Sequence, residues 1–429
     1  MQTKMVKILA GAALSLGMAS TVLAQSSMDQ AAAAERNAAA AGRSSFQGGT
    51  GATMNVGGLI QFRYNANFRS DDGTNITRDD DTTIGFSNAR TKIWFKGDIN
   101  SDLSYGVMGA FENGSSGSFN LDDAYFTYKF SDMFSVKGGQ FKLPVLREEL
   151  VADANQLAVE RSFTNEVFSQ GRSQGVSLNF KSGDNFRGSA AFSDGLRTKN
   201  TDFNSSSESD WAVTGRVEFK WAGDWDRFAD FTSFKGQGNA GMVGAALHYQ
   251  ASQNTGDGND AALNTAASAF MLYTVDAALE GDGWNLYGAL IGSFNDPDNA
   301  GEDSTNTFGL VIQGGVFVAD QWELFGRWDA IFADKDAGAG AQLDPKSFHF
   351  ITAGVNYYLI PGKQTMKFTL QGMVALNETA ALRSTDPTSG AGGSSASGFS
   401  SPLPFTHGGI LGDVDSGEFS LVAQVQVVF

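Results

Sequence analysis

The side chains best suited to act on a solute are arginines and lysines that recur at alternate positions of short apolar segments. In the segment NARTKIWFKGDI, Arg90, Lys92 and Lys96 fall on one side of an extended chain. Ile93 and Phe95 fall on the other side. Successive side chains of a strand point to opposite faces, so this segment needs water on one face and an apolar medium on the other. The cationic face could bind anions through charge-assisted hydrogen bonds.

The same alternation places further charges on hydrophilic strand faces. The cations expected there are Arg63, Arg90, Lys92, Lys96, Lys129, Arg216, Lys220, Arg327 and Lys367. The acids expected there are Asp98, Asp123, Glu218, Glu323 and Asp329. Nine cations against five acids make these faces net positive, although the whole chain carries a formal charge of -17. We therefore expect a path that favours anions, with simple pairing of neighbouring opposite charges as the alternative.

Residues for enzymatic chemistry are scarce. The only histidines are His248, His349 and His407, and none lies in a recognisable motif. Cysteine is absent, which removes thiol nucleophiles and cysteine-based metal sites. We expect no catalytic residues, no metal site and no cofactor.

The first 24 residues have the features of a secretory signal peptide. Lys4 and Lys7 precede an apolar run, and small residues Val22 and Ala24 occupy the positions that determine cleavage. Removal of residues 1–24 would change the formal charge from -17 to -19. An exported, strongly acidic chain is a poor candidate for nucleic-acid binding.

The remaining sequence divides into a leader and a long β-rich region. Residues 25–53 are low in complexity and predict a helical or flexible leader. Residues 54–429 contain no apolar run near the roughly 18 to 20 residues of a membrane helix, and the chain has 52 Gly and 34 Phe. The alternative way to span a bilayer is a closed β-barrel, which pairs every backbone group between strands.

Sixteen alternating segments can be recognised in this region, so we predict an all-β fold, a 16-stranded antiparallel transmembrane β-barrel. A barrel of this size is wide enough to hold an aqueous lumen. The strands are expected to start near Met54, Thr83, Leu103, Phe119, Phe134, Ser173, Phe186, Asp210, Met242, Ala269, Trp284, Thr307, Gln321, Phe348, Thr365 and Gly417.

The connections and the chain end fit an outer-membrane barrel of a Gram-negative-type bacterium. The long polar stretches 71–81, 198–210 and 383–398 predict extracellular loops, and shorter joins predict periplasmic turns. The last strand ends in Phe429, a terminal aromatic residue of the kind that the barrel-assembly machinery recognises. Outward aromatic girdles are expected from Phe126, Tyr128, Phe130, Trp211, Phe219 and Trp221. A secreted β-sandwich would explain neither these aromatics nor the charged opposite faces.

The alternation breaks between the fifth and sixth strands, at about residues 143–172. Pro144 ends a strand, and Leu146, Leu150 and Leu157 then follow in a helix-like spacing among many charges. A loop of this length with its own local structure is usually functional. We expect it to fold into the lumen and narrow the pore.

Several motifs resemble the phosphate-selective porin family, porins O and P. The run GGQFKLPVLREEL followed by AVERSF is similar to that family's constriction segment, and NARTKIWFKGDI and LDDAYFTYKF resemble its early strands. The similarity is clearest over residues 57–180. It implies a 16-stranded homotrimer whose third extracellular loop forms the constriction.

The resemblance also implies site residues. The lysine of the GQFK motif is Lys142 and the arginine of the Glu-Arg-Ser motif is Arg161. The full expected constriction set is Lys142, Arg147, Glu148, Glu149, Arg161 and Arg172. Leu143 stands where the family often has an acidic residue, and Asp153 and Glu160 make the following segment more acidic. These departures weaken the case for strict phosphate selectivity.

We therefore expect a passive diffusion channel for small hydrophilic solutes, with an anion preference that could extend to phosphate or polyphosphate. Expected partners are outer-membrane lipid and lipopolysaccharide, the barrel-assembly machinery, two further copies of the chain and small anionic solutes, but no nucleic acid. One alternative is a general or sugar-permeable porin, for which Trp94, Tyr125 and Phe325 could provide stacking surfaces. Another is a barrel that anchors or adheres without transport.

Overall fold

The computed structural model describes residues 44–47, 51–69, 82–111, 117–203, 205, 208–252, 268–297, 304–334, 347–378, 406–407, 410–411 and 415–429. The predicted signal peptide, residues 1–24, lies outside this set, as do the polar stretches 71–81 and 383–398 and most of the leader. Of the leader, Ser44–Gln47 forms strand β1, which pairs antiparallel with the start of β2.

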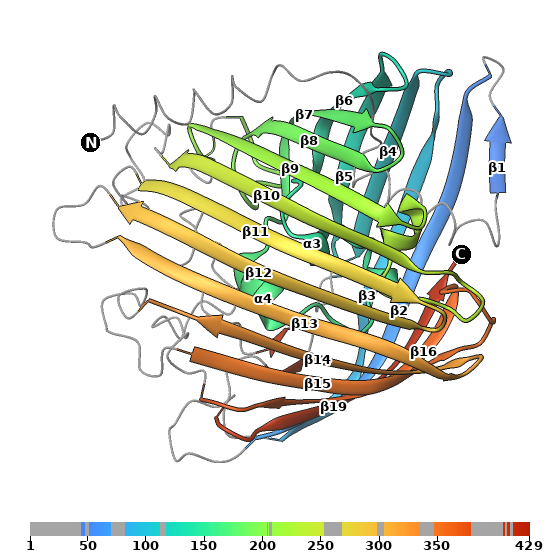
Figure 1. Ribbon diagram of the computed structural model, residues 1–429, viewed down its shortest axis with the longest axis vertical. Coiled ribbons are helices and arrows are strands. Elements are labelled where there is room, and N and C mark those ends of the chain that lie inside the picture. Colours follow the sequence, from blue (N-terminus) through green and yellow to red (C-terminus); the bar gives the residue numbers. More distant parts are fainter. Residues whose placement is uncertain are drawn as a thin grey trace.

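Sixteen antiparallel strands form a closed barrel, as the alternation predicts (Figure 1). Each strand pairs with the next along the chain, and β19 pairs with β2 to close the ring. Every strand starts within two residues of its predicted position. The strands are β2 (Thr53–Phe68), β3 (Thr83–Asp98), β4 (Leu103–Phe111), β5 (Phe119–Lys129), β6 (Phe134–Lys142), β7 (Arg172–Ser182), β8 (Phe186–Ser193), β9 (Trp211–Ala222), β10 (Ala240–Ser252), β11 (Ser268–Gly281), β12 (Trp284–Pro297), β13 (Thr305–Ala319), β14 (Trp322–Phe332), β15 (Ser347–Tyr358), β16 (Met366–Ala375) and β19 (Phe419–Val428).

Side chains alternate between an apolar outer face and a polar inner face. In β9, Trp211, Phe219 and Trp221 are exposed on the outside, whereas Arg216 and Glu218 are buried inside. The outward positions predicted for Phe126, Tyr128 and Phe130 are also confirmed. An apolar exterior around a polar interior is the arrangement that a lipid-facing barrel requires.

The seam of the barrel is completed by the last residue. The backbone of Phe429 exchanges two hydrogen bonds with Gly58, and the Phe429 ring lies against Gly58, where a Cβ would meet the ring Cζ at 2.4 Å. The glycine therefore provides the space that the terminal aromatic ring occupies.

The two ends of the barrel differ. At one end, which we call the turn end, most connections are short, for example the two residues between β11 and β12. At the other, the loop end, the connections include residues 143–171 between β6 and β7, which we call the constriction loop. It contains α3 (Arg147–Leu150), the 3-10 helix η1 (Asp153–Asn155) and α4 (Phe163–Phe168).

Two further short segments complete the architecture. The 3-10 helix η2 (Trp225–Ala229) lies in the connection between β9 and β10. The hairpin of β17 (Thr406–His407) and β18 (Ile410–Leu411) lies between β16 and β19. Over the part of the chain that the structure describes, no helix is both long and apolar enough to cross a membrane.

Strand β6, which leads into the constriction loop, depends on Gly139. This residue has φ = 126°, a conformation that disfavours residues with a Cβ, and an added Cβ would lie 2.2 Å from the carbonyl oxygen of Ala124 in β5. We expect Gly139→Ala to destabilise the barrel by more than about 1 kcal/mol and to reduce the folded fraction. Heat-modifiable migration on SDS gels measures that fraction. Gly215→Ala in β9, where a Cβ would meet nothing within 4 Å, is the matched control, and equal folding of both variants would contradict this account.

Candidate functional site

The constriction loop folds into the barrel and fills part of its lumen, as the sequence predicts. Its side chains Leu143, Leu157 and Phe163 are buried. Phe163 stacks on Phe350 of β15, with ring centroids 4.4 Å apart, and α4 packs against β13 and β14. The apolar positions of helix-like spacing therefore form a core between the loop and one side of the inner wall.

Polar side chains of the wall bind the carbonyl oxygens of this loop. Arg216 of β9 donates to Val145 over 2.8 Å, and Asn356 of β15 donates to Leu157 over 2.9 Å. The other donors are Arg327 to Glu160 (2.8 Å), Lys367 to Gln156 (2.7 Å) and Gln426 to Ala154 (2.9 Å). Buried backbone carbonyls need such partners, so these side chains hold the loop in place.

Most of the predicted lumen cations therefore do not border the open part of the lumen. Arg63 is fully buried between Gln424 and Glu160. Arg216, Arg327 and Lys367 hold the constriction loop, and Lys220 donates to the carbonyl of Gly223 near the turn end. Lys129 lies at the end of β5, where it is half exposed and pairs with Asp132 in the following turn. Alternation gives the correct face for these residues but cannot tell which part of that face the loop covers.

Arg147 and Glu148 also lie within the packed loop and do not border the passage. Arg147 donates to the carbonyl of Phe228 over 2.5 Å, and its guanidinium lies 5.5 Å from the ring centroid of Phe231. Glu148 accepts hydrogen bonds from the backbone amide and hydroxyl of Ser162, both at 2.7 Å. The motif that contains them is thus divided between structural residues and residues that reach the passage.

A second inward segment, the β9–β10 connection of residues 223–239, was not predicted. Its residues Phe228, Phe231 and Phe234 are buried, and the amide of Phe231 donates to the carbonyl of Asn155 in the constriction loop over 3.2 Å. The aromatic spacing in WDRFADFTSF was a detectable signal, because a turn facing water has no reason to contain these phenylalanines.

Open space remains beside β3 to β7, as two neighbouring cavities that share lining residues. The loop-side cavity is bordered by Arg90, Lys92, Asp122, Lys142, Glu149, Asp153, Arg161 and Arg172, together with four neutral residues. The turn-side cavity is bordered by Lys92, Lys96, Asp123, Lys137, Lys142, Asp153 and Arg172 and by ten neutral residues. Lys92, Lys142, Asp153 and Arg172 border both cavities and therefore define the constriction.

Cations and carboxylates are paired around this constriction. Lys92 lies 2.9 Å from Asp122 and 2.8 Å from Asp153. The other pairs are Lys142 with Glu149 (2.9 Å), Arg161 with Asp153 (2.7 Å) and Arg172 with Asp123 (2.8 Å). Glu160 pairs with both Arg63 and Arg90. Asp153 and Glu160, which the sequence marks only as departures from the family motif, are thus the counter-ions of the constriction.

The carboxylates of Glu149 and Asp153 in the constriction loop remain ionised. Burial opposes the charge on Glu149, but Arg161 and Lys142 outweigh it and hold the pKa of this carboxyl well below its usual range. Burial is likewise outweighed at Asp153, where Lys92, Arg161 and Arg90 lower the pKa. The constriction is therefore an array of fixed opposite charges at neutral pH.

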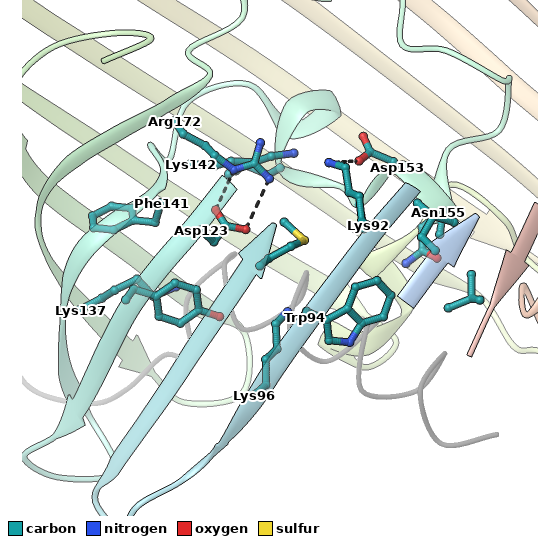
Figure 2. A pocket seen from close by; sticks show the side chains of 17 residues that line it. Lys92, Trp94, Lys96, Asp123, Lys137, Phe141, Lys142, Asp153, Asn155 and Arg172 are labelled. Carbon is teal, nitrogen blue, oxygen red and sulfur yellow. Dashed lines mark hydrogen bonds and ion pairs between the residues drawn. The ribbon is translucent and has the colours of Figure 1, made fainter. Parts of the chain in front are cut away.

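The turn-side cavity has the larger excess of positive charge. Five cations and two carboxylates border it, whereas five cations and three carboxylates border the loop-side cavity. Figure 2 shows Lys96 and Lys137 below the constriction, with Arg172 bonded to Asp123 above them. Lys137 escaped sequence analysis because Gly138 and Gly139 interrupt the alternation of β6.

Two of the three aromatic residues considered for stacking reach this passage. Trp94 and Tyr125 border the turn-side cavity, and the ammonium of Lys137 lies 4.2 Å from the Tyr125 ring centroid. Phe325 is instead buried in the core formed with the constriction loop.

Comparison with known proteins identifies the family. The model of the family "phosphate-selective porin O and P" matches residues 62–378, most of the chain. The chain belongs to this family. It is thus a porin, a channel-forming barrel integral to the outer membrane, and the resemblance in the constriction motif is confirmed at the level of the family.

Solved structures support the same fold. This porin is 12% identical to the outer membrane channel DcaP of Acinetobacter baumannii, with a TM-score of 0.55 and coverage of 89% of this chain and 99% of the other. OmpF of Salmonella typhi, solved in complex with daunomycin, is 14% identical to this porin, with a TM-score of 0.56 and coverage of 90% of this chain and 100% of the other. The trimer form of OmpT of Vibrio cholerae is 11% identical to this porin, with a TM-score of 0.52 and coverage of 88% of this chain and 99% of the other. No curated protein sequence matches.

The carboxylate of Asp153 should limit the anion preference of this porin. It lies 2.7 Å from Arg161 and 2.8 Å from Lys92, so Asp153→Asn leaves two cations that border the passage less neutralised. We expect the anion-to-cation permeability ratio to rise about two- to fivefold, because one charge at about 4 Å in water-like screening is worth about 1 kcal/mol. Reversal potentials in a KCl gradient measure the ratio. Asp132→Asn, at the exposed turn, is the control; an unchanged or lower ratio for Asp153→Asn would contradict the assignment.

The contribution of the β9–β10 connection to the stability of the porin should depend on pH through Asp230. This residue interacts with Glu280, Arg147 and Lys367, and burial raises its pKa to about 6 from 3.8. A raised pKa means that the folded state holds the proton more tightly, so the contribution of Asp230 to stability decreases as the pH rises from about 4 to 6.

We expect Asp230→Asn to stabilise the porin above pH 6 by at most about 3 kcal/mol, since one pKa unit corresponds to about 1.4 kcal/mol. Thermal unfolding in detergent across this pH range measures the effect. Asp226→Asn, an exposed position in η2, is the control. Parallel pH profiles for Asp230→Asn and the unmodified porin would refute the role of Asp230.

Proposed function

We propose that this porin is a passive diffusion channel for small hydrophilic solutes with a preference for anions. The observation that carries the proposal is the charge of the turn-side cavity, where five cations, three of them at the constriction, face two carboxylates. Cations that line a water-filled pore lower the energy of an entering anion by replacing part of its hydration.

The cations follow one another along the passage. An anion from the loop end first meets Arg90 and Arg161, then Lys92, Lys142 and Arg172 at the constriction. It then meets Lys96 and Lys137 in the turn-side cavity. The constriction cations already have carboxylate partners, so an anion competes for them and binds weakly. Weak binding at successive sites allows conduction, because a tightly bound ion would not leave.

Phosphate and polyphosphate are candidate solutes because of the family. The carboxylates Asp122, Glu149 and Asp153 border the same passage and repel multivalent anions more than monovalent ones. We therefore propose a general preference for small anions, in which phosphate is accepted without strict selectivity.

The proposal includes the setting of the channel. A cleaved signal peptide at residues 1–24 would export the chain, and the long loops would face the exterior among lipopolysaccharide. Phe429, which lies on the outer face at the barrel seam, would be the signal for the barrel-assembly machinery. The trimer form of OmpT, which shares the fold, supports a homotrimer.

Removal of the cations beyond the constriction tests the proposed preference. In planar bilayers, the unmodified porin should give an anion-selective reversal potential in a KCl gradient. The double variant Lys96→Gln, Lys137→Gln should lower the anion-to-cation permeability ratio at least about fivefold, since each removed charge is worth about 1 kcal/mol at short range in water. Lys129→Gln, which removes a rim charge, should leave the ratio nearly unchanged.

Phosphate gives an independent measurement on the same membranes. Added phosphate should reduce the chloride current, and Lys142→Ala or Arg161→Ala should weaken that reduction. A cation-selective unmodified porin would overturn the anion proposal and favour a general porin. A barrel that conducts no ions at all would favour an anchoring or adhesive role.

A further inference from the structure

The turn-side cavity has an apolar surface that conduction of inorganic anions does not require. Leu59, Trp94, Met108, Ala154 and Val428 form one packed cluster, and all five border the cavity. A hydrated inorganic ion gains no favourable contact from such an apolar cluster, because an ion is stabilised by water or polar groups.

Aromatic rings and ammonium groups meet within this cavity. Figure 2 shows Phe141 on one side and Trp94 on the other, with Lys137 below Phe141, Lys96 below Trp94 and Asp123 between the two rings. The ammonium of Lys137 lies 4.2 Å from the Tyr125 ring centroid and 5.8 Å from that of Phe141. The cavity therefore offers flat apolar surfaces beside positive charge, a combination typical of sites for small organic ligands.

The charges indicate how many negative groups a ligand should carry. Every cation that borders the cavity already has an interaction partner, among them Asp123 for Arg172 at 2.8 Å and constriction carboxylates for Lys92 and Lys142, so a bound anion competes with these groups. Lys96 and Lys137 are the cations of the cavity that lie farthest toward the turn end, and Asp123 beside them repels a second negative group. This arrangement favours one negative group over two.

We propose that the turn-side cavity is a binding site for organic monoanions with a compact apolar body, of the aromatic carboxylate class. The carboxylate would lie near Lys96 and Lys137, and the ring would lie against Trp94, Tyr125 or Phe141. The proposal rests on the proposed function, because it takes the passage to be open to anions. It goes further by naming the chemical class of solute that the cavity distinguishes from inorganic anions.

Benzoate and acetate test the role of the apolar body, since they share the carboxylate and differ in the ring. The measurement is the reduction of single-channel chloride current in purified full-length porin, with each anion added in turn from the side of the turn end. We expect benzoate to bind at least about tenfold more tightly than acetate, since a methylene-sized apolar group in a pocket is commonly worth roughly 10- to 200-fold. Phthalate, with a second carboxylate, should bind less tightly than benzoate.

Two matched variants test the location. Trp94 covers Gly57 on the inner face, and Trp221 covers Gly241 on the outer face, so both are tryptophans packed over a glycine of a neighbouring strand. Trp94→Leu should remove most of the preference for benzoate over acetate and leave the KCl reversal potential unchanged. Trp221→Leu should change neither. Lys137→Met, which retains an apolar chain, should weaken the binding of benzoate and the binding of acetate by similar factors.

The outcomes separate this inference from the proposed function. Equal binding of benzoate and acetate by an anion-selective pore would overturn the organic-anion site and leave the anion channel intact. Tighter binding of inorganic phosphate than of benzoate would overturn it as well. A cation-selective or silent pore would instead refute the proposed function on which the inference rests. The comparison of benzoate with acetate needs only the unmodified porin, so it decides the matter even if Trp94→Leu does not fold.

Discussion

The structure depends on one constraint, that a loop folded into a barrel must find hydrogen-bond partners for its backbone. The constriction loop is connected to β9, β15 and β19 by side chains such as Arg216, Asn356 and Gln426, which donate to its carbonyls. These donors explain why much of the inner wall is polar although it does not border water. They also influence where the passage runs, because in the part of the chain that the structure describes the two cavities lie beside β3 to β7, away from the strands that hold the loop.

The sequence was sufficient to predict the barrel. Its alternation is a direct consequence of lipid outside and polar partners inside, so all sixteen strand starts could be placed to within two residues. The inward course of the constriction loop could also be predicted, because its apolar spacing had no place on an outer surface. Lys92, Lys142 and Arg172 were expected from pattern and family resemblance, and they border the constriction.

The position of each charge around the lumen could not be predicted from alternation. Arg63 and Arg90 lie on the same inner face and bind the same Glu160, yet only Arg90 borders the passage. The difference arises from the path of the loop, which depends on contacts between residues far apart in the sequence. Lys137 was missed for a local reason, the two glycines that follow it, and the inward β9–β10 turn was missed because its length alone resembled an ordinary connection.

The closure of the barrel by its last strand, β19, affects how the molecule forms. Gln426, which holds Ala154, lies 272 residues away from it in the sequence, and the donor Asn356 lies 199 residues from Leu157. Contacts of such separation form late, because a long stretch of chain must be ordered before they can be made. The hydrogen bond from Gln426 to the constriction loop can therefore form only after β19 has joined the sheet. A nascent barrel that lacks β19 would hold its constriction loop by fewer hydrogen bonds than the complete one.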